Sequence, residues 1–510
     1  MREILRQHAR FFLFSALAGL ALRLLFLYRF PAITADSFIY GDIARNWLQH
    51  GIYGLTELDQ IVPTYIRLPG YPAFLAAVFR IFGMEHYRAV LSIQIFADLG
   101  TCFIVADIAR RLISERAARA AFLLSALCPF LANYSAAALT ETLEIFFTAL
   151  ALDFALVGLA SFEVAPVASS ANNPIGRHPE RSRSSGGEGP ALSGVEGDLA
   201  CTTVALKFYP GHFHPGAWLA CGLSIGACLL LRPDGGLLLA AILGYMAWVF
   251  VKRVRKTESA IPVLKVALIL TLAALAPLVP WTLRNLHTLH TFQPLAPRYA
   301  NEEDSLVPMG FNRWTKTWIA DYVSNEEVFW MVPGSPIDSD KLPSRAFDSL
   351  AQQEQSERVL ADYNQQLRIT PGLDARFAAL AQQRIHAAPL RYYVWLPLLR
   401  IADMWLRPRT ELLPSDSRWW EFDDTPQWSV LAVVIGAINL LYIGAACLGL
   451  ARGRFAPHLG LLLTFVVLRS IFLGTLENPE PRYTLECYPV IIIVASALFQ
   501  NSQRQLGVKV

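Results

Sequence analysis

The sequence predicts an all-α polytopic membrane protein. Three observations support this prediction: 54% of the 510 residues are hydrophobic, only 17% are charged, and the apolar residues form long runs with charges between them. An average soluble domain carries about 25% charged residues. The formal net charge of +3, from 44 Lys+Arg and 41 Asp+Glu, excludes a basic nucleic-acid binder and an acidic disordered tail as the main class of protein.

Ten apolar segments approach the length of about 20 residues that a helix needs to cross a bilayer. They are residues 11–28, 88–110, 118–134, 139–160, 217–231, 236–251, 262–281, 427–450, 456–474 and 484–500. No small-residue cleavage site follows the first segment, so we expect a retained span there. Six of the seven cysteines lie in or beside these runs without metal-ligand spacing, which indicates apolar core residues.

The charges of the short loops predict the orientation of the chain. With the N-terminus in the cytoplasm, every short basic cluster falls on one side of the membrane. These clusters are Arg2/Arg6/Arg10, Arg110/Arg111/Arg116/Arg119, Lys252/Arg253/Arg255/Lys256, Arg452/Arg454 and Arg504/Lys509. Ten spans return the C-terminus to the same side. We therefore expect both termini in the cytoplasm and residues 29–87 and 282–426 outside.

The long segments suggest three modules. We expect a membrane module over residues 1–300, an outer soluble and interfacial segment over residues 301–425, and C-terminal spans over residues 426–510. The first outer loop, residues 29–87, should hold interfacial helices. Residues 161–216 are rich in Gly, Ser, Pro and Arg, which predicts a disordered cytoplasmic insertion.

Helical segments that do not cross the membrane are expected in both outer regions. Residues 343–387 are rich in Ala, Gln, Glu, Arg and Leu, which favours helix. Residues 389–407 are apolar, but charges and a proline interrupt them, so we expect a helix lying in the membrane interface. The apolar stretch between Arg67 and Gly83 is also too short to span and should be a second interfacial helix.

The first outer loop carries the candidate catalytic acid, Asp36. Thr34 is a suitable N-cap and Gly51 a suitable C-terminal stop, which predicts a helix between them. Asp36 and Tyr40 then lie near one face. The helix dipole favours an ionised carboxylate in the first turn. The structural alternative for Asp36 is an ordinary aspartate at a helix start.

Ionisable residues recur at the outer ends of the predicted spans. Glu141 lies at or just inside such an end, where a charge is costly and indicates function. Arg232, Arg284 and Arg482 stand at outer ends, where the orientation gains nothing from them. A guanidinium fork suits a phosphate, so one interpretation is an anionic ligand at this face. The other is snorkelling or a local pair, such as Arg482 with Glu480.

Several segments carry a family resemblance. Four of them are Asp36-Ser-Phe-Ile-Tyr40, Arg67-Leu-Pro-Gly-Tyr-Pro-Ala-Phe-Leu, Tyr134 to Glu141, and Glu480-Pro-Arg482-Tyr483. Arg232-Pro233 and Pro280-Trp281-Thr-Leu-Arg284-Asn285 look like further family segments. With these segments the chain resembles the GT-C superfamily of polyprenyl-phosphate-sugar-dependent glycosyltransferases. It is most similar to bacterial relatives of the protein O-mannosyltransferases, the lipid A aminoarabinose transferases and the rhizobial lipopolysaccharide transferases.

The resemblance implies an inverting glycosyltransferase that moves a hexose or pentose from a polyprenyl-phosphate carrier to an acceptor hydroxyl. The acceptor would be a cell-envelope glycan, a glycolipid such as lipopolysaccharide, or a protein. The site would lie at the outer face of the bacterial cytoplasmic membrane. Ser37 follows Asp36, so the paired Asp-Glu that is frequent in the protein mannosyltransferases is absent, which counts against a protein acceptor.

The resemblance also implies roles for individual residues. Asp36 matches the essential aspartate of the first outer loop and would act as the general base. The residues that would bind the acceptor or a metal are Glu141 and Tyr40. Those that would bind the donor phosphate are Arg67, Arg232, Arg284, Arg482 and Tyr483. The leaving group is already a phosphate, so the chemistry requires cations and no general acid; a divalent metal held by carboxylates stays open as one source of positive charge.

The expected partners are the polyprenyl-phosphate sugar and membrane lipids, without nucleic acid. Three other functions remain open. A transporter or flippase of lipid-linked sugars should hold its polar residues near the bilayer midplane. A ligase or polymerase would join whole glycans. A non-catalytic membrane scaffold would not need acids and arginines at one face. Convergence of Asp36, Glu141 and Arg482 on one outer cavity would favour the transferase.

Overall fold

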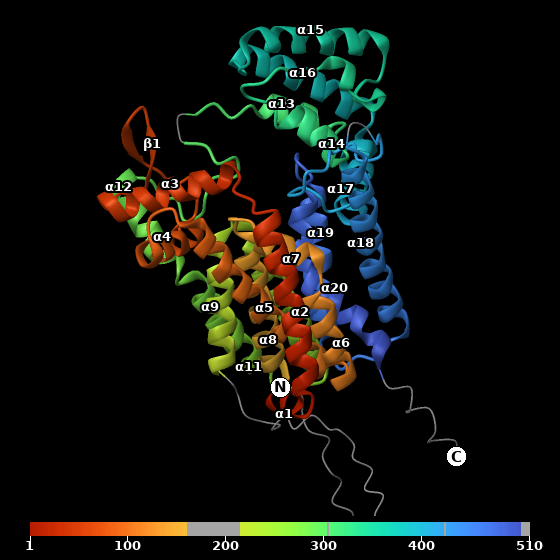
Figure 1. The fold of residues 1–510 in the computed structure, drawn as a ribbon. Coiled ribbons are helices and arrows are strands. Elements are labelled where there is room, and N and C mark those ends of the chain that lie inside the picture. The colour runs from red at the N-terminus through yellow and green to blue at the C-terminus, as the bar shows by residue number, and fades with distance from the viewer. Residues whose placement is uncertain (161–214, 303–304, 423–424, 501–510) are drawn as a thin grey trace, which may run out of the picture.

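The computed structural model describes residues 1–160, 215–302, 305–422 and 425–500. The described chain is a helical bundle with two lobes at one end and the N-terminal helix α1 (Arg2–Gln7) at the other (Figure 1). The described residues contain one antiparallel hairpin, β1 (Gly54–Glu57) with β2 (Gln60–Pro63), in which Leu55 pairs with Val62. The predicted all-α class is confirmed. Most of the predicted insertion 161–216 lies outside the described residues, as does the predicted basic cluster after residue 500.

All ten predicted spans are helical. The long apolar helices are α2 (Ala9–Arg29), α5 (Tyr87–Leu112), α8 (Glu141–Ala160), η1 with α10 (Pro233–Gly235 and Gly236–Arg255), α18 (Pro426–Arg452), and the run η6, α20 and η7 (Pro481–Cys487, Tyr488–Ala495 and Ser496–Phe499). By length and composition, six helices of the described chain can cross a membrane, or eight if each of two bent pairs is one span. The other two predicted spans are the shorter apolar helices α9 (Pro215–Leu231) and α19 (Leu459–Gly474).

Prolines explain the two bent pairs. The helices α6 (Glu115–Ala126) and α7 (Pro129–Ser135) meet at 51°, and α11 (Ile261–Leu275) and α12 (Leu278–Leu289) meet at 44°. Pro129 opens α7, and Pro277 is the N-cap of α12. Because proline has no N–H to donate, an i to i−4 hydrogen bond is lost at each break and the helix turns.

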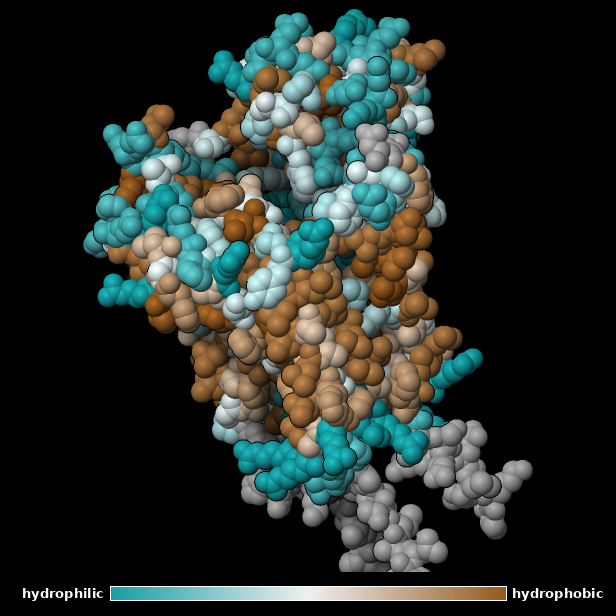
Figure 2. Space-filling view, viewed as in Figure 1, coloured by the Kyte–Doolittle hydropathy of each residue, from teal (hydrophilic) through white to brown (hydrophobic). Residues whose placement is uncertain are grey.

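A broad apolar band crosses the visible face of the bundle, with hydrophilic side chains above and below it (Figure 2). Large apolar side chains of the long helices are exposed, including Leu17 of α2 at 51%, Leu268 of α11 at 60% and Leu441 of α18 at 71%. Hydrocarbon replaces water as the solvent for such a surface. The chain is therefore a multi-pass membrane protein.

The first outer loop forms the smaller lobe. Its first helix, α3 (Ala35–His50), begins with a capping box in which the Thr34 N–H donates to Ser37 Oγ at 2.9 Å, and it stops at Gly51 with φ +72°. Both predicted ends of this helix are confirmed. The hairpin and α4 (Gly70–Phe82) follow, so the stretch predicted to form a second short helix is helical.

The outer segment forms the larger lobe (Figure 1). Its elements are α13 (Met309–Lys316), α14 (Tyr322–Ser324), η2 (Asn325–Phe329), η3 (Ser339–Lys341), η4 (Ser344–Ala346), α15 (Leu350–Gln366), α16 (Pro371–Ala387), η5 (Arg391–Trp395) and α17 (Leu396–Leu406). Trp314, Tyr363 and Phe377 are buried in a separate core here. The helices predicted over 343–387 and 389–407 are present, and α17 packs against α19 of the bundle.

One ion pair lies deep inside the bundle. Arg23 of α2 donates through Nε to Asp98 Oδ2 of α5 at 2.7 Å, and both side chains are almost fully buried. Arg23 Nη1 also donates to the Gly19 carbonyl at 2.9 Å and the Ala126 carbonyl at 2.6 Å. This pair joins three helices and leaves neither charge without a partner.

Candidate functional site

Asp36 faces two arginines from distant parts of the chain. Arg67 Nη2 lies 3.1 Å from Asp36 Oδ1, and Arg482 Nη2 lies 3.9 Å from Asp36 Oδ2. The Asp36 side chain keeps 35% of its surface exposed, so an incoming hydroxyl can reach the carboxylate. The candidate base thus lies between two of the candidate phosphate ligands.

Arg482, at the start of η6, links Asp36 to two further acids. Its Nε lies 2.5 Å from Glu480 Oε2 and 3.8 Å from Glu141 Oε1. The Tyr483 hydroxyl donates to the other oxygen of Glu480 at 2.6 Å. Carboxylates from three separate segments therefore share one guanidinium.

Arg232, at the outer turn between α9 and α10, lies on the other side of Glu141. Its Nη1 donates to Glu141 Oε1 at 3.3 Å, and its Nε lies 3.2 Å from Asp234 Oδ1 and 3.4 Å from Glu144 Oε2. Its guanidinium carbon is 4.9 Å from the Tyr483 ring centroid, within cation–π range. Arg232 and Arg482 thus approach Glu141 and Tyr483 together.

Backbone contacts explain this convergence. The Ala32 N–H donates to the Ala136 carbonyl and the Ala138 N–H to the Ala32 carbonyl, at 3.0 and 2.9 Å, so the chain before α3 pairs with the turn before α8. Ser37 Oγ donates to the Ala138 carbonyl at 2.9 Å. A side chain at Gly70 would meet the Leu230 carbonyl at 2.6 Å, so only glycine allows α4 to approach the end of α9 this closely.

A buried arginine of α19, Arg469, lies behind these groups. Its Nε donates to the Tyr483 carbonyl at 3.0 Å, and its Nη2 donates to Asp234 Oδ2 at 2.9 Å and pairs with Glu486. Only 1% of its side chain is exposed, against 19% for Arg232 and 20% for Arg482. Arg469 therefore holds the framework, while the other two can meet a ligand.

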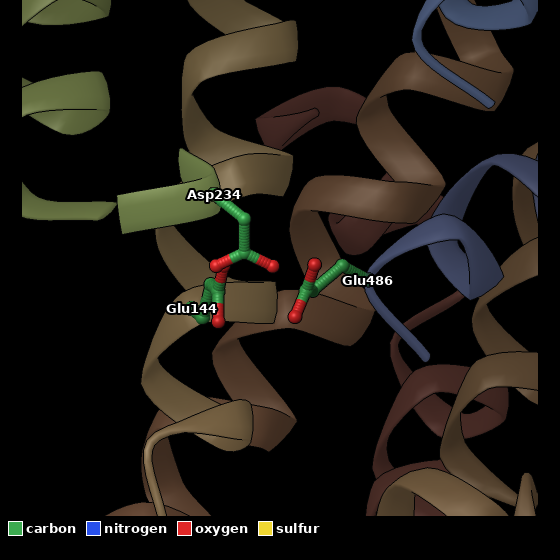
Figure 3. A group of neighbouring side chains, drawn as sticks. All are labelled: Glu144, Asp234 and Glu486. Carbon is green, nitrogen blue, oxygen red and sulfur yellow. The ribbon is translucent and has the colours of Figure 1, made fainter. Parts of the chain in front are cut away.

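Three carboxylates, Glu144, Asp234 and Glu486, point toward one another (Figure 3). One oxygen of each lies within 4.8 Å of the others. Oxygen ligands at such spacing suit a hard divalent cation. However, Arg232 and Arg469 already pair with these carboxylates, so the chain itself supplies cations at this place. Glu141, the acid that the sequence suggested as a metal ligand, is not among the three.

Acids outnumber bases across the site. Six carboxylates share four guanidinium groups through contacts of 4 Å or less. The acids are Asp36, Glu141, Glu144, Asp234, Glu480 and Glu486, and the bases are Arg67, Arg232, Arg469 and Arg482. We call these ten residues the outer network. A ligand phosphate must therefore compete with carboxylates for each exposed arginine.

Tyr40 lies on the helix of Asp36, beside the outer network. Its ring centroid is 5.9 Å from the Arg67 guanidinium carbon and 5.1 Å from the Tyr71 ring. Burial raises the pKa of the Tyr40 hydroxyl to about 12; Arg67 opposes this shift, and Asp36 and Glu141 add to it. Tyr40 therefore stays protonated at neutral pH and can donate a hydrogen bond.

Arg284 is placed apart from the outer network. Its Nη2 donates to the Tyr53 carbonyl at 2.6 Å and its Nη1 to the Thr64 carbonyl at 2.8 Å, which ties α12 to the first outer loop. It lines a mainly apolar cavity of about 420 Å³ together with Trp47, Tyr53 and Trp281. The structure thus brings seven of the eight candidate site residues together and leaves Arg284 outside.

Sequence reasoning missed part of the outer network. Arg469 and Glu486 each stand alone inside a predicted span, and an ionisable residue within a span indicates function or a buried partner. That signal was present for both. Asp234 carries no comparable signal, because an aspartate in a Pro-Asp-Gly turn is common. Its contacts depend on where α9, α10 and α19 meet.

A protein-family model matches part of the chain. A model of the dolichyl-phosphate-mannose-protein mannosyltransferase family matches residues 64–162. This stretch contains Arg67 and Glu141 and lies between Asp36 and the other arginines of the outer network. The match covers less than half of the chain and agrees with the resemblance to the protein O-mannosyltransferases over this stretch. No curated protein sequence matches the chain.

Solved structures of two membrane enzymes are similar to the chain. The archaeal oligosaccharyltransferase AglB from Archaeoglobus fulgidus, in complex with an inhibitory peptide and a dolichol-phosphate, is 13% identical with a TM-score of 0.44, over 97% of this chain and 50% of that one. ArnT from Cupriavidus metallidurans, bound to undecaprenyl phosphate, is 14% identical with a TM-score of 0.38, over 94% of this chain and 77% of that one. The chain thus spans about half the length of the oligosaccharyltransferase.

Proposed function

We propose that this protein is a GT-C glycosyltransferase that transfers a sugar from a polyprenyl-phosphate carrier to an acceptor hydroxyl at the outer face of the membrane. The observation that carries the proposal is the meeting of Asp36, Glu141 and Arg482 through contacts of 3.8 and 3.9 Å. These residues come from three distant segments. A protein that only scaffolds others gives no reason for such convergence.

In the proposed reaction, the acceptor oxygen attacks the anomeric carbon while the bond from that carbon to the phosphate oxygen breaks. Asp36 takes the proton from the acceptor hydroxyl. The electron pair of the breaking bond stays on the phosphate, which leaves as polyprenyl phosphate. Attack opposite the leaving group inverts the anomeric centre.

The exposed arginines would stabilise the phosphate. Arg67, Arg232 and Arg482 each keep about a fifth of the side chain exposed, at 19%, 19% and 20%. A guanidinium that is already fixed toward the phosphate stabilises the charge that develops as the bond breaks. Tyr483 keeps two of these cations over its ring. Glu141 and Tyr40 are proposed to bind the acceptor.

The proposal extends to location and substrate class. We propose the bacterial cytoplasmic membrane, with both termini inside and a glycan or glycolipid of the cell envelope, such as lipopolysaccharide, as acceptor. Residues 1–300 and 426–510 would together form the catalytic module, because the outer network draws residues from both. Residues 301–425 would cover that module. Arg284 would affect the reaction indirectly, because it holds the first outer loop, which carries Asp36.

Transfer in isolated membranes tests the proposal. Wild-type membranes receive a panel of polyprenyl-phosphate hexoses and pentoses, and released polyprenyl phosphate is measured. D36N should abolish release without lowering expression. The matched control is D42N, because Asp42 lies on the same helix but pairs with Arg45 and Thr56. Release by D36N at the wild-type rate would contradict the proposal. So would the absence of release by the wild type from every donor of the panel.

A further inference from the structure

Glu411 is a buried carboxylate outside the outer network. It lies between α17 and α18, in the outer segment. Both of its carboxylate oxygens are buried, and within the described residues no other residue donates a hydrogen bond to them; its own backbone N–H interacts with the carboxylate. The Tyr134 hydroxyl of α7 is buried and unbonded as well. Polar groups buried without partners are costly, so these groups indicate a partner that the chain does not supply.

Arg409 fixes this segment to the helix that carries Arg482. It donates to the Pro481 carbonyl at 2.7 Å, to Thr484 Oγ1 at 2.5 Å and to the Tyr488 hydroxyl at 2.9 Å. Glu411 follows two residues later, and Glu480, the residue before η6, interacts with it electrostatically.

The electrostatics agree with this position. Burial raises the pKa of the Glu411 carboxyl; Arg409 opposes the shift and Glu480 adds to it. Burial also raises the pKa of the Tyr322 hydroxyl, and the charge of Glu411 is the largest further cause, ahead of Glu326 and Glu480. Glu411 also interacts electrostatically with the Tyr134 hydroxyl, so the two groups are neighbours in the folded chain.

We propose that Glu411, with the Tyr134 hydroxyl, forms a sugar-binding subsite that the outer segment adds to the outer network. Two carboxylate oxygens accept hydrogen bonds from two neighbouring hydroxyl groups, as a sugar ring presents them. A phosphate is a poor ligand for Glu411 itself, because both groups accept hydrogen bonds and both carry negative charge. The subsite rests on the proposed function, and it makes Glu411 a specificity-determining residue.

The hydroxyl pair belongs either to the donor sugar or to a glycan acceptor. Both sources share the chemistry, and both would stand close to the phosphate at Arg482. Because the Glu411 oxygens are covered in the ligand-free chain, a sugar reaches them only when the side chains around them move. Loss of the carboxylate should therefore weaken sugar binding more than phosphate binding.

Thermal unfolding of the full chain in lipid nanodiscs tests the subsite without requiring turnover. One arm compares a prenyl-phosphate hexose with free prenyl phosphate, and the other adds an alkyl glycoside. In the wild type, the Tm gain from the hexose should exceed that from prenyl phosphate, or the glycoside should raise the Tm. E411Q should lose this sugar-dependent gain, with about tenfold weaker sugar binding, and keep the gain from prenyl phosphate.

The control is E326Q, which removes another carboxylate of the same lobe. Unlike Glu411, Glu326 has a side-chain hydrogen-bond partner, Ser417. It should retain every ligand-dependent gain. Ligand-free E411Q should unfold at the wild-type Tm or above, because Gln keeps the shape and removes an unpaired buried charge. The subsite would be overturned if neither arm gives a sugar-dependent increase in the Tm of the wild type. It would also be overturned if E411Q keeps the full increase, or if ligand-free E411Q unfolds at a lower Tm than the wild type. The proposed function is tested separately: it would fail if the membrane assay detected no release of polyprenyl phosphate.

Discussion

The Arg23–Asp98 pair and the outer network use the same side chains in opposite ways. The pair has one acid for one base, and Arg23 completes its coordination with backbone carbonyls. The outer network has more acids than bases and keeps three arginines partly exposed. A balanced, closed pair holds helices together in the membrane, whereas an unbalanced, open network leaves charges to meet a ligand.

The largest expected effect separates rate from stability within the outer network. D36N should lower kcat by about 10²- to 10⁴-fold, because the general base is lost. Its Tm should match the wild type, since Asp36 is partly exposed. Initial rates and thermal unfolding of the same nanodisc sample measure both effects. A large drop in Tm would place Asp36 with the structural pair instead.

The opposite result is expected for the deep pair. D98N leaves the Arg23 charge buried without its carboxylate, which costs about 3–5 kcal/mol. The yield of folded protein and the Tm should fall, while the activity per folded molecule should stay near wild type. The double variant R23M/D98L should regain most of the stability. If D98N folds normally, the pair contributes little to holding α2 against α5.

A smaller effect is expected for the exposed arginines. R482K keeps the positive charge but loses the planar fork, so kcat/KM for the donor should fall about tenfold, through a higher KM and a lower kcat. R110K at the opposite end of the bundle is the control, and it should leave both constants unchanged. Steady-state kinetics with varied donor measure the split. Unchanged values of both constants would remove Arg482 from the donor site.

The stability that Arg469, the buried arginine of the outer network, provides should depend on the balance of charges around it. R469Q leaves Asp234 and Glu486 with less positive charge and should destabilise the protein. The double variant R469Q/E486Q removes one charge of each sign and should fold better than the single variant. It should still lose about three- to tenfold in kcat/KM, because Arg232 and Tyr483 lose their common support. Full activity of the double variant would show that Arg469 does not position the arginines.

The smallest effect concerns pH and the outer lobe. Asp403 accepts the Tyr322 N–H at 2.9 Å, and burial raises the pKa of its carboxyl from 3.8 to about 6. An acid with a raised pKa contributes its stability in full below its unfolded pKa and loses it as pH rises through the folded pKa. The wild-type Tm should therefore fall by about 2–4 °C between pH 4 and 7 relative to D403N. If the Tm of the wild type and the Tm of D403N change in the same way with pH, Asp403 is not the cause of the pH dependence.

Much of the fold follows from local chemistry in the sequence. The apolar runs predict helices because a backbone in hydrocarbon must satisfy its own hydrogen bonds, and every predicted span is helical. Thr34 and Gly51 predict the ends of α3 because a cap and a left-handed stop are local features. The acids and arginines at the outer ends were also visible, since charges there have no local reason to exist.

Only the tertiary structure decided which of these charges meet. Arg232, Arg284 and Arg482 have similar sequence contexts, yet two join Glu141 and the third binds backbone carbonyls of the first outer loop. Arg469 and Glu411 gain their significance from segments that lie next to them only in the folded chain. Burial, ion pairing and charge balance depend on all neighbours in space, and a sequence lists only neighbours along the chain.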